Sequence, residues 1–442
     1  MDMVNTPAEN FNKQLAEFID GSPTPFHAVA NIASLLLEAG FQVLSESEDW
    51  TLKQGEKYFV TRNGSSIIAF VAGSEDLAES GIRMAGAHTD SPCLMVKPQP
   101  EMLNNKYFQL GVEVYGGALL NPWFDRDLSL AGRLVYSDVS GQLKQKLVNF
   151  DEAIAIIPSL AIHLDRTANK DRTINSQTDI PPILMQAEET TDFRELLAQH
   201  FLSDNEKVMD YELCFYDVQG AATVGLKKEF FAAARLDNLL SCFVATKALI
   251  NADTVSTSVL VCNDHEEVGS VSSVGADGPF LESVVDRLCN ELCPDERASN
   301  KARVLDGSLL ISCDNAHAVH PNFADKHEAG HKPELNGGPV IKVNSNQRYA
   351  TNGVTSSLFR QLCDQVDVPV QSFVTRTDLG CGSTIGPVTA AKLGIPTLDV
   401  GIPQLAMHSC RELTGALDPE RLSRVLTRFF NQPGRLQITV GG

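Results

Sequence analysis

The chain has 442 residues, of which 43% are hydrophobic and 21% are charged. This balance is that of an ordinary globular protein and excludes a mostly disordered chain. The formal net charge of −20 argues against nucleic acid and anionic membrane surfaces as partners, because phosphate binding needs clustered Lys and Arg.

The apolar runs are too short to cross a membrane. A bilayer span needs about 20 consecutive apolar residues, whereas the longest runs are residues 32–39 and 154–162. Residues 1–12 are polar and lack the apolar core of a signal peptide. The ten cysteines are scattered without a C-x-x-C pair, which is typical of free thiols in a reducing compartment. We therefore expect a cytoplasmic protein that does not bind membranes.

Helices and strands alternate over roughly the first 95 residues. A helix is predicted over residues 10–19, ending at Gly21, and a second from the segment SPTPF at 22–26 to Gly40. Proline at the first turn and glycine at the end are typical helix boundaries. Short apolar strands are predicted at 57–61, 66–71 and 82–87, and the last runs directly into His88.

From residue 100 to about residue 228 the pattern changes. Apolar and polar residues alternate at 106–114, 132–136 and 143–149, as in antiparallel strands with one solvated face. A polar stretch at 168–179 is expected to be a mobile loop. The sequence therefore predicts an inserted β-rich domain over residues 100–228.

After residue 228 the alternation of helix and strand resumes. A helix is predicted at 237–252, and apolar strands are predicted at 255–262, 307–313, 338–343, 370–374 and 397–401. Buried strands alternating with helices indicate an α/β fold with a mixed sheet flanked by helices. Residues 1–99 and 229–442 are therefore predicted to form one discontinuous catalytic domain.

Carboxylate and imidazole side chains occur near the ends of these apolar segments. They are His88, Asp90, Asp237, Glu266, Glu267, Asp314 and His408. Ligands bind where the strands of open α/β sheets end, so these side chains are expected to converge. Two histidines and three carboxylates supply the ligands of a two-metal site, in which one carboxylate bridges both ions.

Each of these residues also has a structural interpretation. Asp237 and Asp314 are suitable helix N-caps, and adjacent glutamates are usually solvated. On an extended segment Glu266 and Glu267 would point to opposite faces, whereas a turn would let one bind metal while the other faces the water. Asp90 is suitably spaced to accept the imidazole N–H of His88 and fix its tautomer.

The sequences of several segments resemble motifs of the M18 family of metalloaminopeptidases, the aspartyl aminopeptidases. The resemblance rests on AHTDSPC at 87–93, DHEEVGS at 264–270 and RTDLGCGSTIGP at 376–387. SPTPFHA at 22–28, IHLDR at 162–166 and VNSNQRY at 343–349 agree as well. It extends from about residue 10 to about residue 430, with an inserted domain where that family has one.

The resemblance implies a role for each residue of the cluster. His88 and Asp314 are expected to bind one metal ion, Glu267 and His408 the second, and Asp237 both. Glu266 is expected to be the general base for a metal-activated hydroxide, and Asp90 to orient His88. In related metallopeptidases the peptide bond after the bridging aspartate is cis, and the same is expected between Asp237 and Asn238. Zinc is the expected metal, although cobalt and manganese also suit His and carboxylate ligands.

The resemblance also implies a substrate and an assembly. Lys342 and Tyr349 are expected to contact peptides with an N-terminal Asp or Glu, with Arg348 as a second candidate cation. Lys342 can equally be read as an exposed lysine on an edge strand. His163 is expected to reach a neighbouring subunit's active site within a tetrahedral homo-dodecamer. Because a strongly acidic enzyme attracts acidic peptides poorly, the pocket must be a local positive exception.

Two other functions are compatible with parts of the sequence. A metalloaminopeptidase of broader specificity would use the same ligands without a cationic pocket. A catalytically silent scaffold would be expected to lose one or more ligands, whereas all five and Glu266 are present. His27, His265, His317 and His320 are expected to be structural rather than further ligands.

Overall fold

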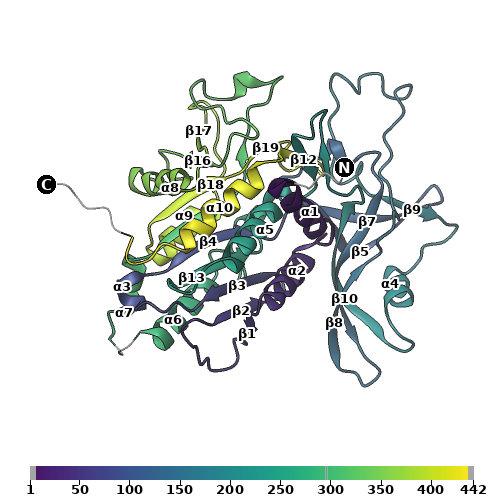
Figure 1. Cartoon of the computed structure of the whole chain (residues 1–442). Helices are drawn as coiled ribbons and strands as arrows, with labels where there is room; N and C mark the ends of the chain where they lie inside the picture. Colours follow the sequence, from purple (N-terminus) through teal and green to yellow (C-terminus); the bar gives the residue numbers. More distant parts are fainter. Residues whose placement is uncertain (1–5, 294, 296, 437–442) are drawn as a thin grey trace, which may run out of the picture.

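The structure, a computed structural model, describes residues 6–293, 295 and 297–436. Residues 1–5 and 437–442, the two ends of the predicted catalytic domain, lie outside the described residues. The described chain is built around three β-sheets of nine, six and five strands (Figure 1).

The nine-stranded sheet is mixed, because β4 pairs in parallel with β13 and β14, whereas β3 is antiparallel to β2 and β13. Its order is β1-β2-β3-β13-β4-β14-β18-β16-β17. The strands are β1 (Gln42–Val43), β2 (Lys57–Arg62), β3 (Ser66–Val71), β4 (Arg83–His88), β13 (Ser258–Asn263), β14 (Leu309–Cys313), β16 (Val340–Val343), β17 (Gln371–Val374) and β18 (Thr397–Gly401).

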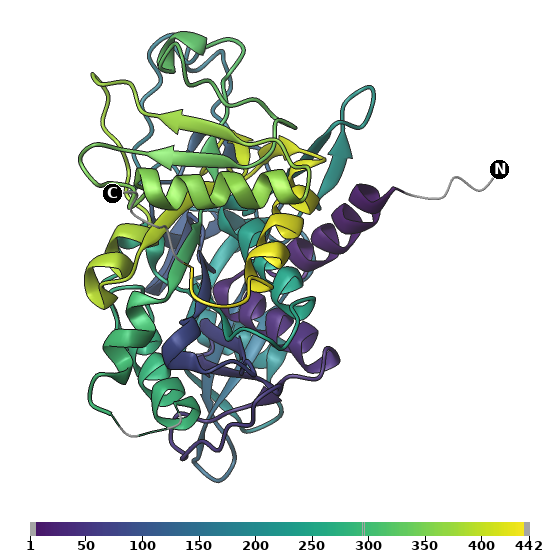
Figure 2. The same ribbon diagram turned by 60° about the vertical axis from the view of Figure 1, so that its left-hand side comes forward.

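Helices cover both faces of this sheet. Along β3, Ala69 packs into the core on one face and Phe70 into the core on the other, so the strand reads as an unbroken apolar run. The first face carries α1 (Pro7–Asp20), α2 (Pro25–Glu38), α5 (Leu236–Ile250), α8 (Gly353–Gln365) and α10 (Asp418–Phe430), of which α8 and α10 are seen in Figure 2. The second face carries α3 (Leu77–Ser80), α6 (Phe280–Leu292), α7 (Asn300–Asp306) and α9 (Ile385–Leu393).

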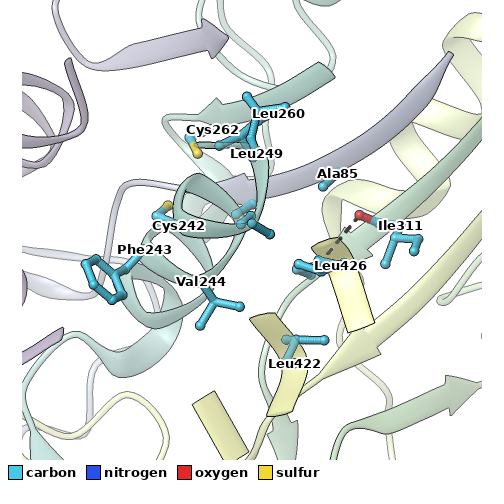
Figure 3. Packing of buried hydrophobic residues seen from close by; sticks show 14 of the residues in the cluster. Ala85, Cys242, Phe243, Val244, Leu249, Leu260, Cys262, Ile311, Leu422 and Leu426 are labelled. Carbon is cyan, nitrogen blue, oxygen red and sulfur yellow. Dashed lines mark hydrogen bonds between the residues drawn. The ribbon is translucent and has the colours of Figure 1, made fainter. Parts of the chain in front are cut away.

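Helix α5 is the most deeply buried of the helices on the first face. Its residues from Leu236 to Thr246 are all buried, polar Asp237 and Asn238 included. Figure 3 shows Cys242, Val244 and Leu249 of α5 among side chains of the sheet strands and of α10. This packing fixes the start of α5, where Asp237 lies.

The six-stranded sheet is antiparallel and has its own core, which includes Phe108, Phe193 and Phe215. Its strands are β5 (Cys93–Asn104), β6 (Tyr107–Tyr115), β7 (Leu128–Ser137), β8 (Leu143–Asn149), β9 (Ile183–Gln186) and β10 (Lys207–Asp217), with η1 (Asn121–Trp123) and α4 (Phe193–Phe201). The sheet begins at Cys93 rather than near residue 100. The division of the chain into two domains stays a prediction.

The strands of the five-stranded sheet come from parts of the chain that are distant in sequence. Its strands are β11 (Ala222–Val224), β12 (Phe230–Ala233), β15 (Ala316–His317), β19 (Pro403–Leu405) and β20 (Glu412–Gly415). Two short helical turns, η2 (Glu266–Val268) and η3 (Ala324–Lys326), complete the elements. The sheet places β12 just before Asp237 and β20 just after His408.

The predicted α/β fold class, a mixed sheet flanked by helices with an additional β-rich region, is confirmed. All ten cysteines are free, as the sequence predicts. No helix within residues 6–293, 295 and 297–436 is both long and apolar enough to span a bilayer.

Candidate metal centre

The predicted ligands converge because three neighbouring parallel strands end together. Strands β13, β4 and β14 are adjacent, and Asn263 at the end of β13 pairs with His88 at the end of β4. Asp314 directly follows β14, and Glu266 and Glu267 lie in the turn after β13. The carboxyl ends of parallel strands meet at one edge of a sheet, which is where ligands bind in such folds.

Asp237 lies at the middle of the cluster, in the first turn of α5. Its Oδ1 is 3.4 Å from Nε2 of His88, and its Oδ2 is 3.5 Å from Nε2 of His408. The peptide bond that links it to Asn238 is cis, as the resemblance implies. The two oxygens of one buried carboxylate therefore face two different histidines.

The remaining predicted ligands fall into two groups around these histidines. Asp314 Oδ1 lies 3.8 Å from His88 Nε2. Glu267 Oε2 lies 3.4 Å from His408 Nε2. Each group thus contains one histidine and one carboxylate of its own and shares Asp237 with the other.

The Glu266–Glu267 pair lies in a turn and not on an extended strand. The short helix η2 is flanked by His265 and Gly269, both with positive φ. The turn brings both carboxylates toward the cluster, since both line the same cleft as His88 and His408.

Asp90 contacts both this turn and the ring of His88. Its carboxylate accepts the backbone N–H groups of Glu266 and Glu267 at 3.1 and 3.0 Å and the hydroxyl of Tyr115 at 2.7 Å. Its Oδ1 lies 3.3 Å from Nδ1 of His88, and its backbone carbonyl lies 3.0 Å from the same nitrogen. A proton on Nδ1 would leave Nε2 free to face the carboxylates.

The cluster brings several carboxylates together in a buried environment. Burial raises the pKa of Glu266 to about 7 and that of Glu267 to about 9. Burial alone would lower the pKa of His408, but Asp237 and Glu267 raise it to about 9. Ionising both Glu266 and Glu267 beside Asp237 and Asp314 is therefore unfavourable unless a further cation binds there.

The donor set fits a divalent cation. Asp237 Oδ1 and Glu267 Oε1 are buried and accept no hydrogen bond from any described residue. Ligand atoms of His88, Asp237 and Glu267 lie within 4.8 Å of one another. Buried oxygens without donors are costly, and a metal ion bound by these oxygen and nitrogen atoms would remove that cost.

A cleft of about 1110 Å³ opens onto the cluster. The buried Lys342 lies in its wall, where Nζ donates to Asp314 Oδ2 at 3.2 Å and to the carbonyl of Asn315 at 3.1 Å. The ammonium is 5.0 Å from the centre of the Tyr349 ring. Lys342 is therefore not an exposed lysine on an edge strand.

The other candidate residues differ in whether they line this cleft. Arg348 and His163 are exposed and are absent from the described residues that line this cleft, so their roles stay predictions. His317 does line it. Elsewhere, His27 contacts the cap residue Thr24 through its ring, and His265 contacts Ser272.

The sequence did not point to Glu412. Its buried carboxylate accepts the backbone N–H groups of Asp237 at 3.0 Å and of His408 at 2.7 Å. Tyr115, which donates to Asp90, was also missed. No motif reveals such contacts, and only the position of Glu412 four residues after His408 offered a signal.

A family model described as aminopeptidase I zinc metalloprotease (M18) matches residues 18–430. A probable M18 family aminopeptidase 2 of Stutzerimonas stutzeri is 56% identical over 429 residues, covering 96% of this chain and 98% of that protein. The protein of the same name from Pseudomonas aeruginosa is 56% identical over 425 residues, covering 95% of this chain and 97% of the relative.

Solved structures of similar fold also match this chain. A chain in the cryo-EM structure of the Ape4 and Nbr1 complex is 40% identical with a TM-score of 0.92, covering 96% of this chain and 86% of that one. A chain of the S. cerevesiae mApe1 dodecamer is 30% identical with a TM-score of 0.83, covering 95% and 96%.

Proposed function

The chain belongs to the M18 family of zinc metalloaminopeptidases, and we propose that it removes N-terminal Asp and Glu residues from peptides at a centre of two metal ions. The observation that carries the metal centre is the placement of Asp237 between His88 and His408. His88, Asp314 and Asp237 would hold one ion, and Glu267, His408 and Asp237 the other. Bound there, two divalent ions supply Lewis acidity that activates water and polarises the scissile carbonyl.

Glu266 is proposed as the general base. Its Oε2 lies 3.9 Å from Nε2 of His88, at the edge of the cluster, and in the metal-free chain burial raises its pKa to about 7. A carboxylate within reach of the attacking water can accept its proton and return it. Glu266 would take the proton of the attacking water and deliver it to the leaving amine, while Asp90 holds the turn that carries it.

Lys342 supports a preference for acidic N-terminal residues. It is a buried cation in the wall of the cleft, within a chain of net charge −20. Its ammonium already contacts a carboxylate of the cluster, and substrate carboxylates have the same chemistry. Tyr349, whose ring lies beside this ammonium, would form the apolar side of the same pocket.

The test compares hydrolysis of Asp-, Glu- and Leu-arylamides by the native chain and by Lys342→Ala. Loss of a buried charge-assisted contact costs about 1.5–3 kcal/mol. The ratio of kcat/KM for Asp over Leu is therefore expected to fall about ten- to a hundredfold. Lys13→Ala, at an exposed site on α1, is the matched control. An unchanged ratio in Lys342→Ala would instead support the broader-specificity metalloaminopeptidase.

We also propose a homo-dodecamer in which the β-rich region, residues 100–228, makes subunit contacts. The support is the likeness to a chain of the mApe1 dodecamer. Light scattering on the purified protein should give the mass of twelve chains of 48.0 kDa each. A cytoplasmic location stays a prediction, which cell fractionation tests.

A further inference from the structure

Glu412 links two predicted ligands that come from different parts of the chain. It is the first residue of β20 and is only 2% exposed. Its Oε2 accepts the backbone N–H of Asp237 at 3.0 Å, and its Oε1 accepts that of His408 at 2.7 Å. Each oxygen thus binds the main chain of one predicted ligand.

The surrounding sheet fixes Glu412 itself. Strand β20 is antiparallel to β12, and Glu412 is paired with Ala233, four residues before Asp237. Ser91 Oγ donates to the carbonyl of Asp237 at 2.5 Å. The main chain of Asp237 is therefore held at its N–H by Glu412 and at its C=O by Ser91, which fixes the origin of its side chain.

Glu412 differs from the predicted metal ligands in two respects. Both of its oxygens accept hydrogen bonds, whereas Asp237 Oδ1 and Glu267 Oε1 accept none from the described chain. Glu412 is also absent from the described residues that line the cleft. These contacts assign it to support of the ligands rather than to metal binding.

We propose that Glu412 is a positioning residue of the metal centre, which holds Asp237 and His408 at the spacing that two ions require. This inference rests on the proposed function, because both partners are predicted ligands. Glu412→Gln keeps the shape of the side chain but places an NH2 group against one of the two N–H donors. One ligand then loses its support, and groups that orient ligands typically contribute about 10- to 100-fold to metal affinity.

A matched control lies in the same part of the chain. Asp418 is fully buried and accepts the backbone N–H groups of Asn336 at 2.6 Å and Gly338 at 2.9 Å. Neither partner is among the residues that line the cleft. Asp418→Asn therefore makes the same chemical change away from the cluster.

The experiment titrates metal-free native, Glu412→Gln and Asp418→Asn chains with zinc against a chromophoric chelator. It then records the visible absorption of the cobalt-loaded forms, and circular dichroism confirms folding. Glu412→Gln should bind about 10- to 100-fold more weakly and shift the cobalt spectrum, while Asp418→Asn should match the native protein in both.

Native affinity and spectrum in folded Glu412→Gln would overturn the inference, as would an equal loss in Asp418→Asn. If Glu412→Gln does not fold, Glu412→Asp decides, because its shorter side chain cannot reach both N–H groups. Weaker zinc binding by Glu412→Asp supports the inference, and unchanged binding overturns it. A native chain that binds no zinc would instead refute the proposed metal centre.

Discussion

His408 Nε2 lies 3.5 Å from Oδ2 of Asp237, although Asp237 lies in the first turn of α5 and His408 lies in the distant turn between β19 and β20. The other oxygen of that carboxylate faces His88 at 3.4 Å. Asp237 is therefore the residue on which both halves of the proposed centre depend, and its removal should affect both ions together.

Asp237→Asn is expected to lose both metal ions and to lower kcat/KM more than about 100-fold, since an amide cannot bridge two cations as a carboxylate does. Elemental analysis after dialysis, together with peptidase assays, measures this. Asp364→Asn on the exposed face of α8 is the control. Full metal content in Asp237→Asn would remove Asp237 as the bridging ligand.

The adjacent glutamates should separate chemistry from metal binding. Glu266→Gln is expected to keep its metal and lose about 10²- to 10⁴-fold in kcat, the usual effect of removing a general base. Glu267→Gln is expected to lose metal as well, because Glu267 is a predicted ligand. Metal content and kcat are measured on both variants. Full turnover by Glu266→Gln would exclude it as the base.

The metal-free chain should become less stable as the pH rises from about 5 to 9. Burial raises the pKa of Glu267 from 4.5 to about 9, so the folded chain keeps a proton that the unfolded chain has released. Glu266, with a pKa of about 7, and His408, with a pKa of about 9, act in the same direction. Stability from such groups is lost as the pH passes their folded values.

Thermal unfolding of the chelator-treated chain at pH 6 and pH 9 measures this effect. The Tm should be lower at pH 9, and added zinc should raise it more at pH 9 than at pH 6, because the ions replace the protons. A metal-free Tm that rises between these pH values would contradict the assignment of these buried groups.

His163 is exposed and does not line the described cleft of its own chain, so it should act only on a neighbour. His163→Ala and Glu266→Gln chains are each expected to be weakly active alone. In mixed dodecamers about a quarter of the sites would combine an intact Glu266 with an intact partner His163. Mixing after dissociation should restore activity; absence of recovery would refute action across subunits.

The convergence of the candidate ligands could be predicted from the sequence because several of them adjoin buried strands. His88 and Asp314 end apolar runs, and such strands meet at one edge of an α/β sheet. The family resemblance is confirmed by the family model and by relatives at 56% identity, as is the assignment to metalloaminopeptidases.

Other parts could not be read from local patterns. Strand β5 was missed because Pro98 and Pro100 lie within it, and proline argues against a strand. Loop geometry places His408 beside Asp237, and that geometry depends on pairing between β12 and β20, which are remote in sequence. Glu412 was missed because hydrogen bonds to distant main-chain groups leave no periodic signal. Helix α6, in contrast, has a local signal in the sequence. Its buried residues recur every three or four positions, a spacing that predicts a helix.

The most direct test of the account is the number of zinc ions bound per chain at saturation, measured by elemental analysis of the native protein. Two groups of proposed ligands that share the carboxylate of Asp237 predict two ions per chain. A saturating value of one ion or none would contradict the two-metal centre.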